Sequence, residues 1–459
     1  MESDGDGAAL VGRGKGGGRY LLVSRVLTSG FWQSNVICEA DIVCEGGMGE
    51  KEDCTEGNLR NVGRGRMRCV SEPVLVDVPS TPAEKCEGKD KFYSMVPGFH
   101  DPRIFWSGKG EPLMILNSQS RYGCFGLWIV DLRAVYPPLK DLLAQSPGHA
   151  NNSVSRGPLI SYPSLTELTR TPPSSRSPME KNWIHFSSAI ASYLFYETTP
   201  TARSYARLLG NGFTTSNLTS PLEAPCLPNG FPDPSMEIDL LDGYNPITGR
   251  DRMKDGSWHQ ATNSLKLMLC SRSDTECHAK PATEKETFLA VVQRKMNNGF
   301  NLPTRYERYF VLWSSVPPFE MLAVSRFPVL MANETASGFS AEENWEGDDS
   351  AASTESLVGA EEYARLVEKG VKRDMWYYFT YTVSIAWAWR GMEEDGDGKE
   401  TLREMQSGYL DDDVLLGIGL NDQGQGFAKV RAVELLQCLR TCPAMEDAGK
   451  AEVANESED

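Results

Sequence analysis

From Pro97 to about residue 445 the chain alternates short apolar runs with turn-forming residues, and this alternation constrains the fold more than any other feature. The runs are rich in Val, Ile, Leu and aromatic residues, which favour strands, and the residues between them are Gly, Pro, Asn and Asp, which favour turns. The first three runs, at 104–106, 112–117 and 128–132, predict a hairpin followed by a third strand.

Further strand groups follow along the chain. They lie at 188–197, 265–270 with 288–294, 309–314 with 321–325, 376–389, and 414–420 with 426–431. Helical periodicity is confined to 361–369 and 432–440. This pattern predicts an all-β fold. Small antiparallel sheets repeated around an axis protect their edges, so a β-propeller is the leading architecture and a β-sandwich is the alternative.

The predicted domain organisation has four parts. Residues 1–35 are Gly-rich and without pattern, so we expect them to be disordered, or the recorded start not to be the biological one. Residues 36–96 form a cysteine-rich segment that packs on the propeller, with a strand at 74–78. Residues 97–445 are the catalytic propeller domain, and residues 446–459 are a disordered acidic tail.

Eleven cysteines favour an oxidising compartment. Cys270 with Cys277, and Cys438 with Cys442, could each close a short loop. The sequons predict glycosylation, which also favours the secretory pathway, at Asn151, Asn217 and Asn333.

The start of the chain does not fit that location. No apolar run is long enough to span a bilayer, and the first 34 residues lack a signal-peptide core. The protein is therefore expected to be cytoplasmic if the recorded start is correct, and otherwise to enter the secretory pathway, which is the expectation we favour. A net charge of −17 and a pI near 4.9 argue against a nucleic-acid partner.

The hexapeptide GFHDPR at 98–103 is the strongest candidate for a site. It sets the carboxylate of Asp101 and the guanidinium of Arg103 on either side of a proline, at the start of an apolar strand. Proline restricts the residue before it to extended geometry, which would hold Asp101 in one conformation. We therefore predict that Asp101 is catalytic. The alternative is an ordinary Asp-Pro turn with a surface ion pair.

Other polar and aromatic clusters stand at the heads of later strand groups, and in a propeller these positions converge on an axial funnel. Aromatic faces beside amides and guanidiniums suit a sugar ligand. The alternative is that these side chains are core aromatics and hydrogen bonds between blades. The candidate substrate-binding residues are Arg103, Arg121, Glu180, Lys181, Asn182, Trp183, His259, Gln260, Asn263, Arg305, Tyr306, Glu307 and Arg308. Glu180 and Glu307 are the two carboxylates that could replace Asp101 in its role.

Six motifs together resemble the fungal β-1,2-mannosyltransferase family, and the resemblance covers about residues 60–445. They lie at 98–103, 177–183, 258–265, 305–309, 331–337 and 408–412. The Asp-Pro-Arg element is also similar to that of the β-mannoside phosphorylases, which are five-bladed propellers with a proton-donating aspartate. The resemblance implies a five-bladed propeller, an acid/base role for Asp101 and a supporting or anion-binding role for Arg103. It also implies a Golgi membrane protein facing the lumen, with an N-terminal anchor that this chain lacks.

The function that we expect is inverting transfer of mannose from GDP-mannose to the 2-hydroxyl of a mannan or related mannoside acceptor. Asp101 would be the general base, and cations would stabilise the leaving diphosphate. The cations available are Arg103, Arg121, Lys181, Arg305 and Arg308. A β-mannoside phosphorylase or hydrolase, and a secreted glycan-binding propeller without chemistry, are the alternatives. Metal dependence is open, because the DxD spacing at 395–397 is more typical of a solvated loop.

Overall fold

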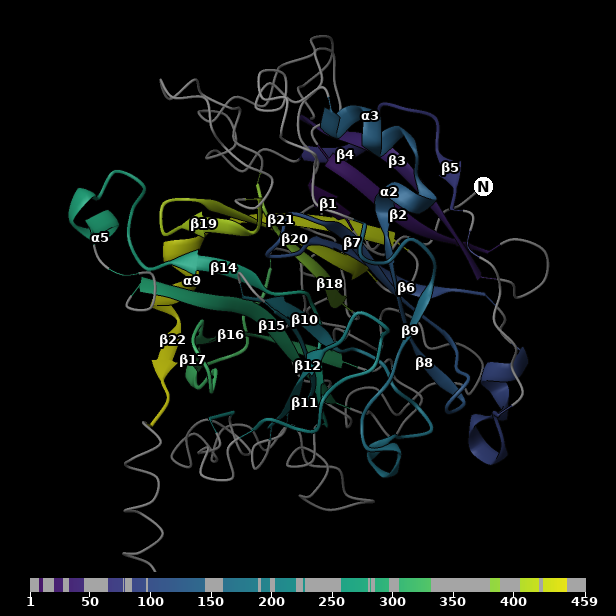
Figure 1. Cartoon of the computed structure of the whole chain (residues 1–459). Helices are drawn as coiled ribbons and strands as arrows, with labels where there is room; N and C mark the ends of the chain where they lie inside the picture. The colour runs from purple at the N-terminus through teal and green to yellow at the C-terminus, as the bar shows by residue number, and fades with distance from the viewer. Residues whose placement is uncertain are drawn as a thin grey trace, which may run out of the picture.

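A computed structural model gives the fold (Figure 1). It describes residues 8–10, 20–27, 33–44, 65–76, 78, 85–95, 98–144, 160–188, 191–198, 203–219, 226–227, 257–279, 281, 285–296, 305–331, 380–388, 405–420 and 424–443. Over these ranges the protein is mostly β and forms five sheets with few helices. The predicted acidic tail at 446–459, helix at 361–369 and DxD loop, and the sequons at Asn151 and Asn333, lie outside the described residues.

The N-terminal segment forms the first sheet. Its strands are β1 (Ala8–Leu10), β2 (Tyr20–Leu27), β3 (Gln33–Cys44) and β4 (Gly65–Cys69) in that order, with β5 (Val74–Leu75) paired to β3. The prediction of disorder up to residue 35 is therefore wrong for β1, β2 and the start of β3. The reason is burial: Leu21 and Val23 are fully enclosed and pack in one hydrophobic cluster with Ile104 and Trp128. The predicted strand at 74–78 is reduced to the two residues of β5.

The second and third sheets are antiparallel meanders. The second consists of β6 (His100–Trp106), β7 (Pro112–Gln119), β8 (Phe125–Asp131) and β9 (Thr166–Leu168). The third consists of β10 (Ile184–Ser187), β11 (Ser192–Thr198) and β12 (Arg203–Leu208). Short helices flank them: η1 (Gly88–Met95), α2 (Leu132–Val135), α3 (Pro138–Ala144) and η3 (Pro173–Ser175). The structure thus confirms the predicted hairpin and its third strand.

The fourth sheet takes strands from distant parts of the chain. Its path is β19 (Ser407–Tyr409), β14 (Leu265–Met268), β15 (Glu286–Met296), β16 (Arg305–Ser314), β17 (Met321–Ser325) and β22 (Leu439–Thr441), with β13 (Ser257–Gln260) also on β15. The fifth sheet consists of β18 (Thr380–Trp387), β20 (Asp413–Leu420) and β21 (Gly424–Arg431). Two helices, α5 (Thr275–Ala279) and α9 (Ala432–Gln437), accompany them.

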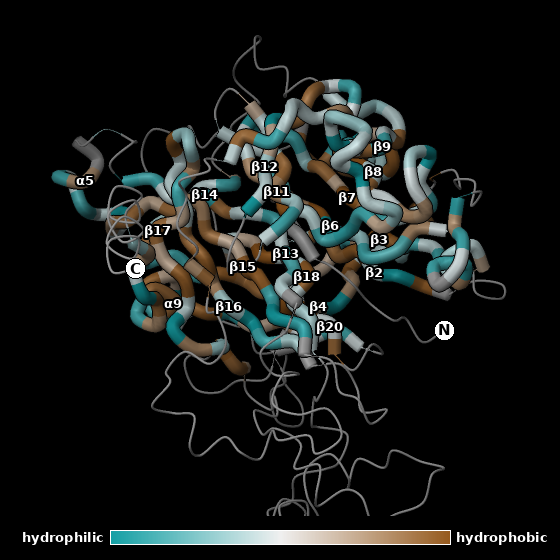
Figure 2. The backbone as a smooth tube through the Cα atoms, turned by 90° about the horizontal axis from the view of Figure 1, so that it is seen from below, coloured by the Kyte–Doolittle hydropathy of each residue, from teal (hydrophilic) through white to brown (hydrophobic). Residues whose placement is uncertain are grey.

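Hydrophobic clusters join each sheet to the next. One cluster holds the first and second sheets together, another the second and third, and a third the third and fourth. The largest cluster joins the fourth sheet to the fifth and also contains Tyr20 and Ala40 of the first. Burial of apolar side chains between faces is the main stabilising contribution in such an arrangement. Figure 2 shows the hydrophobic stretches along the strands and hydrophilic ones at many of the turns.

Four disulfides cross-link the described residues. They are Cys38–Cys69, Cys86–Cys124, Cys226–Cys442 and Cys270–Cys277. The predicted Cys270–Cys277 loop is confirmed, whereas a Cys438–Cys442 bridge is wrong, because Cys438 is free. The extended strand β22 separates those two cysteines, and four strand residues span roughly 13 Å, beyond the reach of a disulfide. Asn217 is exposed, as a glycosylation site must be, and its modification stays a prediction.

Candidate active site

Asp101 lies near the start of β6, at a bulge between His100 and Arg103 in the pairing with β7. Its φ is 49°, in the left-handed region that Asp and Asn tolerate better than most residues. The extended geometry expected for a residue before proline is therefore not what the structure shows. Neighbouring strand β3 fixes the preceding backbone, because the N–H of Phe99 donates to the carbonyl of Gln33 at 3.1 Å.

Two neighbouring side chains hold the Asp101 carboxylate. Asn117 Nδ2 donates to Oδ2 at 3.1 Å, and Arg25 Nη1 lies 3.8 Å from Oδ1. Burial raises the pKa of Asp101, but the charges of Arg25, Arg103 and His100 and the hydrogen bond from Asn117 together outweigh it, so the pKa lies below its usual value. The side chain remains 37% exposed. At neutral pH it is an accessible, ionised carboxylate.

Arg103 connects several sheets. Its Nη2 donates to Asn182 Oδ1 at 2.7 Å and to the Tyr381 hydroxyl at 3.4 Å, and that hydroxyl donates to the carbonyl of Gln260 at 3.2 Å. These residues come from β6, the segment before β10, β18 and β13. Together with Arg25 on β2, strands of four sheets and the segment just before β10 contribute to one group of contacts around Asp101 and Arg103.

The Arg103 guanidinium also has unused donors. Only 3% of the residue is exposed, and its Nε and Nη1 atoms are buried without a hydrogen-bond partner from the protein. A buried cationic donor without a protein partner is costly, and a water or ligand group that reached it would offset that cost. The Gln260 Nε2 atom is likewise buried without a protein partner.

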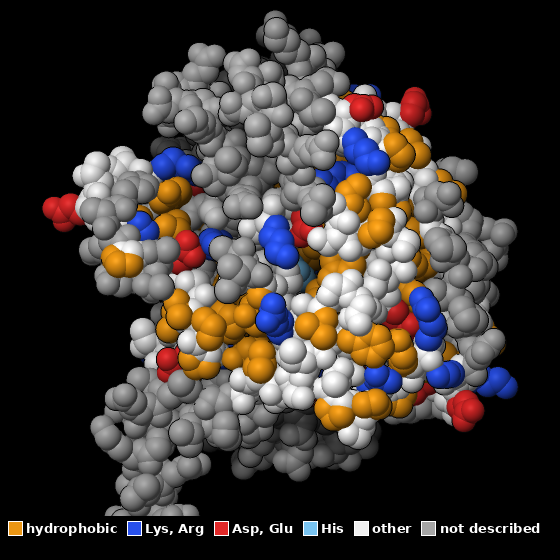
Figure 3. All heavy atoms as spheres, in the orientation of Figure 1, with side chains coloured by type: hydrophobic (Ala, Val, Ile, Leu, Met, Phe, Trp, Pro, Cys, Tyr) orange, Lys and Arg blue, Asp and Glu red, His pale blue; other side chains and the backbone are white. Residues whose placement is uncertain are grey.

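A cationic and aromatic group adjoins this contact network. The ring of Tyr306 meets the ring of Tyr381 at 4.8 Å and lies 6.5 Å from that of His259. Burial, with the charges of Lys295 and Lys181, lowers the pKa of His259 to about 4. Burial and the charge of Lys181 also lower the pKa of Lys295. Figure 3 shows basic side chains near the middle of one face, with a histidine between them.

Three predicted site residues serve the fold instead. Trp183 is 2% exposed and packs on Tyr196 at 5.1 Å between ring centres, so it has no free face for a sugar. Asn263 donates to the carbonyl of Ile385 at 2.9 Å and accepts from its N–H at 3.2 Å, which fastens β14 to β18. Arg308 is buried and donates to Thr382 Oγ1 at 2.5 Å. These outcomes match the core and inter-sheet alternative.

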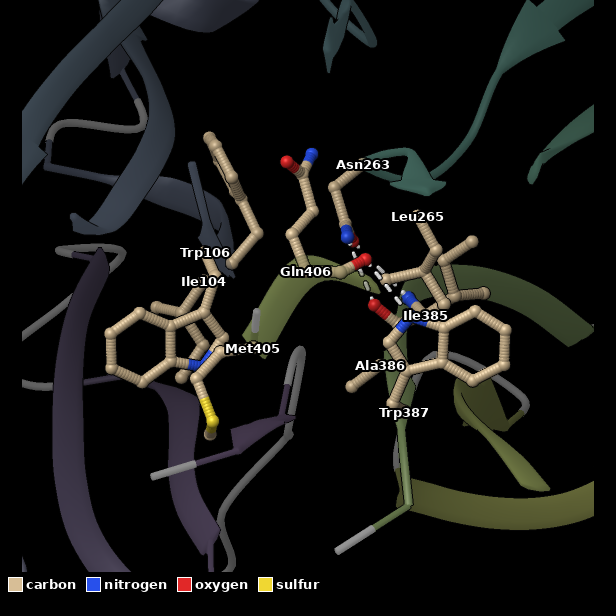
Figure 4. A pocket seen from close by; sticks show the side chains of 10 residues that line it. Ile104, Trp106, Asn263, Leu265, Ile385, Ala386, Trp387, Met405 and Gln406 are labelled. Carbon is tan, nitrogen blue, oxygen red and sulfur yellow. Dashed lines mark hydrogen bonds between the residues drawn. The ribbon is translucent and has the colours of Figure 1, made fainter. Parts of the chain in front are cut away.

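Asn263 lies at the far end of β6 from Asp101. There it lines a small cavity with Trp106, Ile385, Trp387 and Gln406 (Figure 4). The wall is mostly apolar, and the main-chain carbonyl of Gln406 accepts from the Trp387 indole at 2.9 Å. This cavity is separate from the Asp101 site.

The two rival carboxylates are engaged elsewhere. Glu180 pairs with Arg170 at 2.8 Å and accepts from the N–H of Ser177 at 2.7 Å. Burial raises its pKa despite these contacts. Glu307 accepts from the Tyr309 hydroxyl at 3.2 Å. No described hydrogen bond or ion pair joins either carboxylate to Asp101.

Two predicted cations are not placed at Asp101. Arg121 is 62% exposed, lies in the turn between β7 and β8, and contacts Glu167 at 3.4 Å. Arg305 begins β16, but its side chain lies outside the described residues. Lys181 is exposed and approaches the ring of Tyr93 at 6.0 Å, next to Asn182 in sequence.

Sequence reasoning missed Arg25, Asn117, Lys295 and Tyr381. Asn117 could have been found, because the predicted hairpin sets it opposite His100. Arg25 was hidden by the expectation of disorder, although the apolar residues around it are a strand signal. Nothing in the local sequence distinguishes Lys295 or Tyr381 from other strand residues.

No metal site emerges from the described part of the chain, where no three His, Cys, Asp or Glu side chains come together as metal ligands. The site consists of one ionised carboxylate, cations, amides and tyrosines. Such a set can accept a proton from a hydroxyl and stabilise negative charge on a ligand.

No protein-family model matches the chain, and no curated protein matches it. Among solved structures, a candidate glycoside hydrolase from Parabacteroides distasonis is 8% identical with a TM-score of 0.38, over 93% of this chain and 86% of that one. Trypanosoma rangeli sialidase, in complex with sialic acid, is 9% identical with a TM-score of 0.31, over 95% and 45%. A GH43 glycoside hydrolase is 11% identical with a TM-score of 0.28, over 72% and 44%. All three scores lie below 0.5, so these likenesses do not establish a shared fold or activity.

Proposed function

We propose that this protein is a carbohydrate-active enzyme that transfers mannose from a phosphate-bearing donor to a sugar hydroxyl. Asp101 is the general base, and the nearby cations stabilise the leaving phosphate. The observation that carries the proposal is the pairing of an accessible, ionised carboxylate with a buried guanidinium that has unused donors. Amide and tyrosine side chains around this pair suit the hydroxyls and C–H faces of a sugar.

We also propose that the five sheets are the blades of a five-bladed propeller. Supporting this, the hydrophobic clusters join consecutive sheets and the last sheet to the first. The contacts of Asp101, Arg103 and the Tyr381 hydroxyl draw on four of the five sheets and on Asn182, just before the third, as expected for residues near a propeller axis. A ligand funnel on that axis, as the propeller architecture predicts, would include the Asp101 site.

The charge state of Asp101 favours transfer over hydrolysis or phosphorolysis. A general base must be ionised before the reaction, and the lowered pKa of Asp101 keeps it so at neutral pH. A proton donor would need a raised pKa. An inverting hydrolase also needs a second carboxylate about 6.5–9.5 Å away. Among the described residues, the two rival glutamates contact Arg170 and Tyr309 instead.

The choice of mannose as the sugar, of GDP-mannose as the donor and of a mannoside as the acceptor rests on the resemblance of the motifs to the fungal β-1,2-mannosyltransferases. Four disulfides support folding in the secretory pathway, where such an enzyme would meet glycans. No described helix is long and apolar enough to cross a membrane. Membrane association through an N-terminal anchor is therefore a proposal from the resemblance alone.

The test is transfer by the purified full chain from radiolabelled GDP-mannose to a short α-mannoside, with and without manganese. Asp101→Asn should reduce turnover about 10²- to 10⁴-fold, because it removes the base. It should leave the fold intact, because Asn tolerates the same left-handed backbone, with a modest loss of thermal stability from the removed ion pair with Arg25. Asp141→Asn, at an exposed position on α3, is the matched control and should transfer normally.

Other substrates distinguish the alternatives. Release of mannose 1-phosphate from a β-mannoside in phosphate buffer, with GDP-mannose inert, would establish a phosphorylase. Release of free mannose in water would establish a hydrolase. Tight glycan binding without turnover of any donor, or full activity of Asp101→Asn, would refute the proposal.

A further inference from the structure

We propose that Arg25, on the N-terminal strand β2, is a positioning residue of the Asp101 site that fixes the orientation and charge of the Asp101 carboxylate. The inference rests on the proposed function, because it assigns a role within that site. It also makes the first sheet a working part of the site rather than a segment packed against it.

The register of the first sheet places Arg25 at the site. Arg25 pairs with Asn35 across β2 and β3, and Leu27 pairs with Gln33. Asn35 Nδ2 donates to the carbonyl of Phe99 at 3.3 Å, and the Gln33 carbonyl accepts from the N–H of Phe99 at 3.1 Å. These paired residues of β2 and β3 therefore fix the backbone that leads into Asp101. They also position the Arg25 guanidinium that faces the Asp101 carboxylate.

The ion pair itself is partly enclosed. The Arg25 side chain is 16% exposed and that of Asp101 37% exposed, with 3.8 Å between Nη1 and Oδ1. Shielding from water strengthens such a pair relative to one on an open surface. On the other carboxylate oxygen, Asn117 donates from β7, so two elements fix the carboxylate from two sides.

Four groups determine the charge of Asp101. Arg25 faces it from β2, His100 and Arg103 from β6, and Asn117 from β7. Arg103 directs its Nη2 to Asn182 and the Tyr381 hydroxyl, whereas Arg25 directs its Nη1 to the carboxylate. Burial raises the pKa of Asp101, and among the groups that lower it the charge of Arg25 contributes most.

The decisive experiment titrates the Asp101 carboxyl in the full-length protein, with aspartate carboxyl carbons labelled with ¹³C for NMR. Asp101→Asn identifies the signal. Arg25→Gln should move its midpoint upward, and Arg25→Lys should retain most of the wild-type behaviour because it keeps the charge. Arg68→Gln, at an exposed position on β4 of the same sheet, should leave the midpoint unchanged. An unmoved midpoint in Arg25→Gln, or an equal shift in Arg68→Gln, would overturn the proposal.

The experiment distinguishes a failure to fold, and a failure of the proposed function, from a failure of the Arg25 assignment. If Arg25→Gln does not fold, Arg25→Met keeps the apolar stem and removes the charge, so the same comparison can be made. The titration needs no substrate, so a wild-type protein without transferase activity would refute the proposed function while the result for Arg25 stands.

Where transfer is detected, the pH profile of kcat/KM gives a second readout. Arg25→Gln should lose about tenfold at the acid end, because the base then holds its proton more tightly, and should recover toward wild type at alkaline pH. An equal loss at every pH would indicate a merely structural role and contradict the assignment.

Discussion

His185 should make the stability of this protein fall as the solution is acidified. The residue lies on β10, is 1% exposed, and its ring centre is 4.8 Å from that of Phe105. Neither ring nitrogen has a hydrogen-bond partner in the protein. Burial, together with the charge of Lys109, lowers its pKa to about 3.

Proton linkage gives the direction and size of the change in the free energy of unfolding with pH. Below pH 6.5 the unfolded chain protonates His185, but the folded protein does not until about pH 3, so acid favours unfolding throughout that window. Since one pKa unit is worth about 1.4 kcal/mol, the free energy of unfolding should fall by about 2 kcal/mol at pH 5 and about 4 kcal/mol at pH 3 from this residue alone.

Urea unfolding of the wild type and of His185→Leu, at pH 7.5 and pH 5.0, measures this contribution. Comparing the two proteins cancels the effects of His259 and of the acidic residues. The loss of stability between the two pH values should be about 2 kcal/mol smaller in His185→Leu. At pH 7.5 the variant should also be more stable, by about 1–3 kcal/mol, because two buried polar atoms without partners are removed. An equal pH dependence in both proteins would refute the reasoning.

Two further predictions concern the backbone around the site and the end of the chain. A Cβ on Gly98, whose φ is 100°, would lie 1.9 Å from the Gln33 carbonyl oxygen, so Gly98→Ala should lower the melting temperature and abolish transfer; wild-type activity in this variant would contradict the placement of Asp101. The Cys226–Cys442 bridge closes a loop with a sequence separation of 216, so replacing both cysteines with serine should cost about 5 kcal/mol in the free energy of unfolding. Cys438→Ser is its control, and comparable loss in both variants would show that the bridge is not the cause.

The fold was largely predictable where turn-forming residues separate consecutive apolar strands. The run at 104–132 carries Gly, Pro and Asn between apolar segments, and it forms β6, β7 and β8 as expected. Strand β2 was missed because glycines surround it and its buried residues do not alternate simply. Its place in the fold depends on Ile37 and Ile104, which belong to other strands.

The site was predictable only in part, for a similar reason. Local chemistry singled out Asp101, Arg103 and Asn182, and the structure joins the latter two across 79 residues of sequence. A single sequence cannot separate a tryptophan that stacks on a ligand from one that fills a core, and Trp183 fills the core. Contacts such as Arg25 with Asp101 depend on which sheets are neighbours, which no local pattern records.

The fourth sheet has a consequence for how the chain must assemble. Its edges are provided by β19 and β22, which are made only after β18 of the fifth sheet. Strands β13 to β17 are synthesised well before β19 and β22. During synthesis β14 and β17 are therefore the unpaired edges of this sheet. Unpaired edge strands favour association between nascent chains. Folding of this protein should therefore depend on keeping the fourth sheet from pairing with other chains until β19 and β22 have been synthesised.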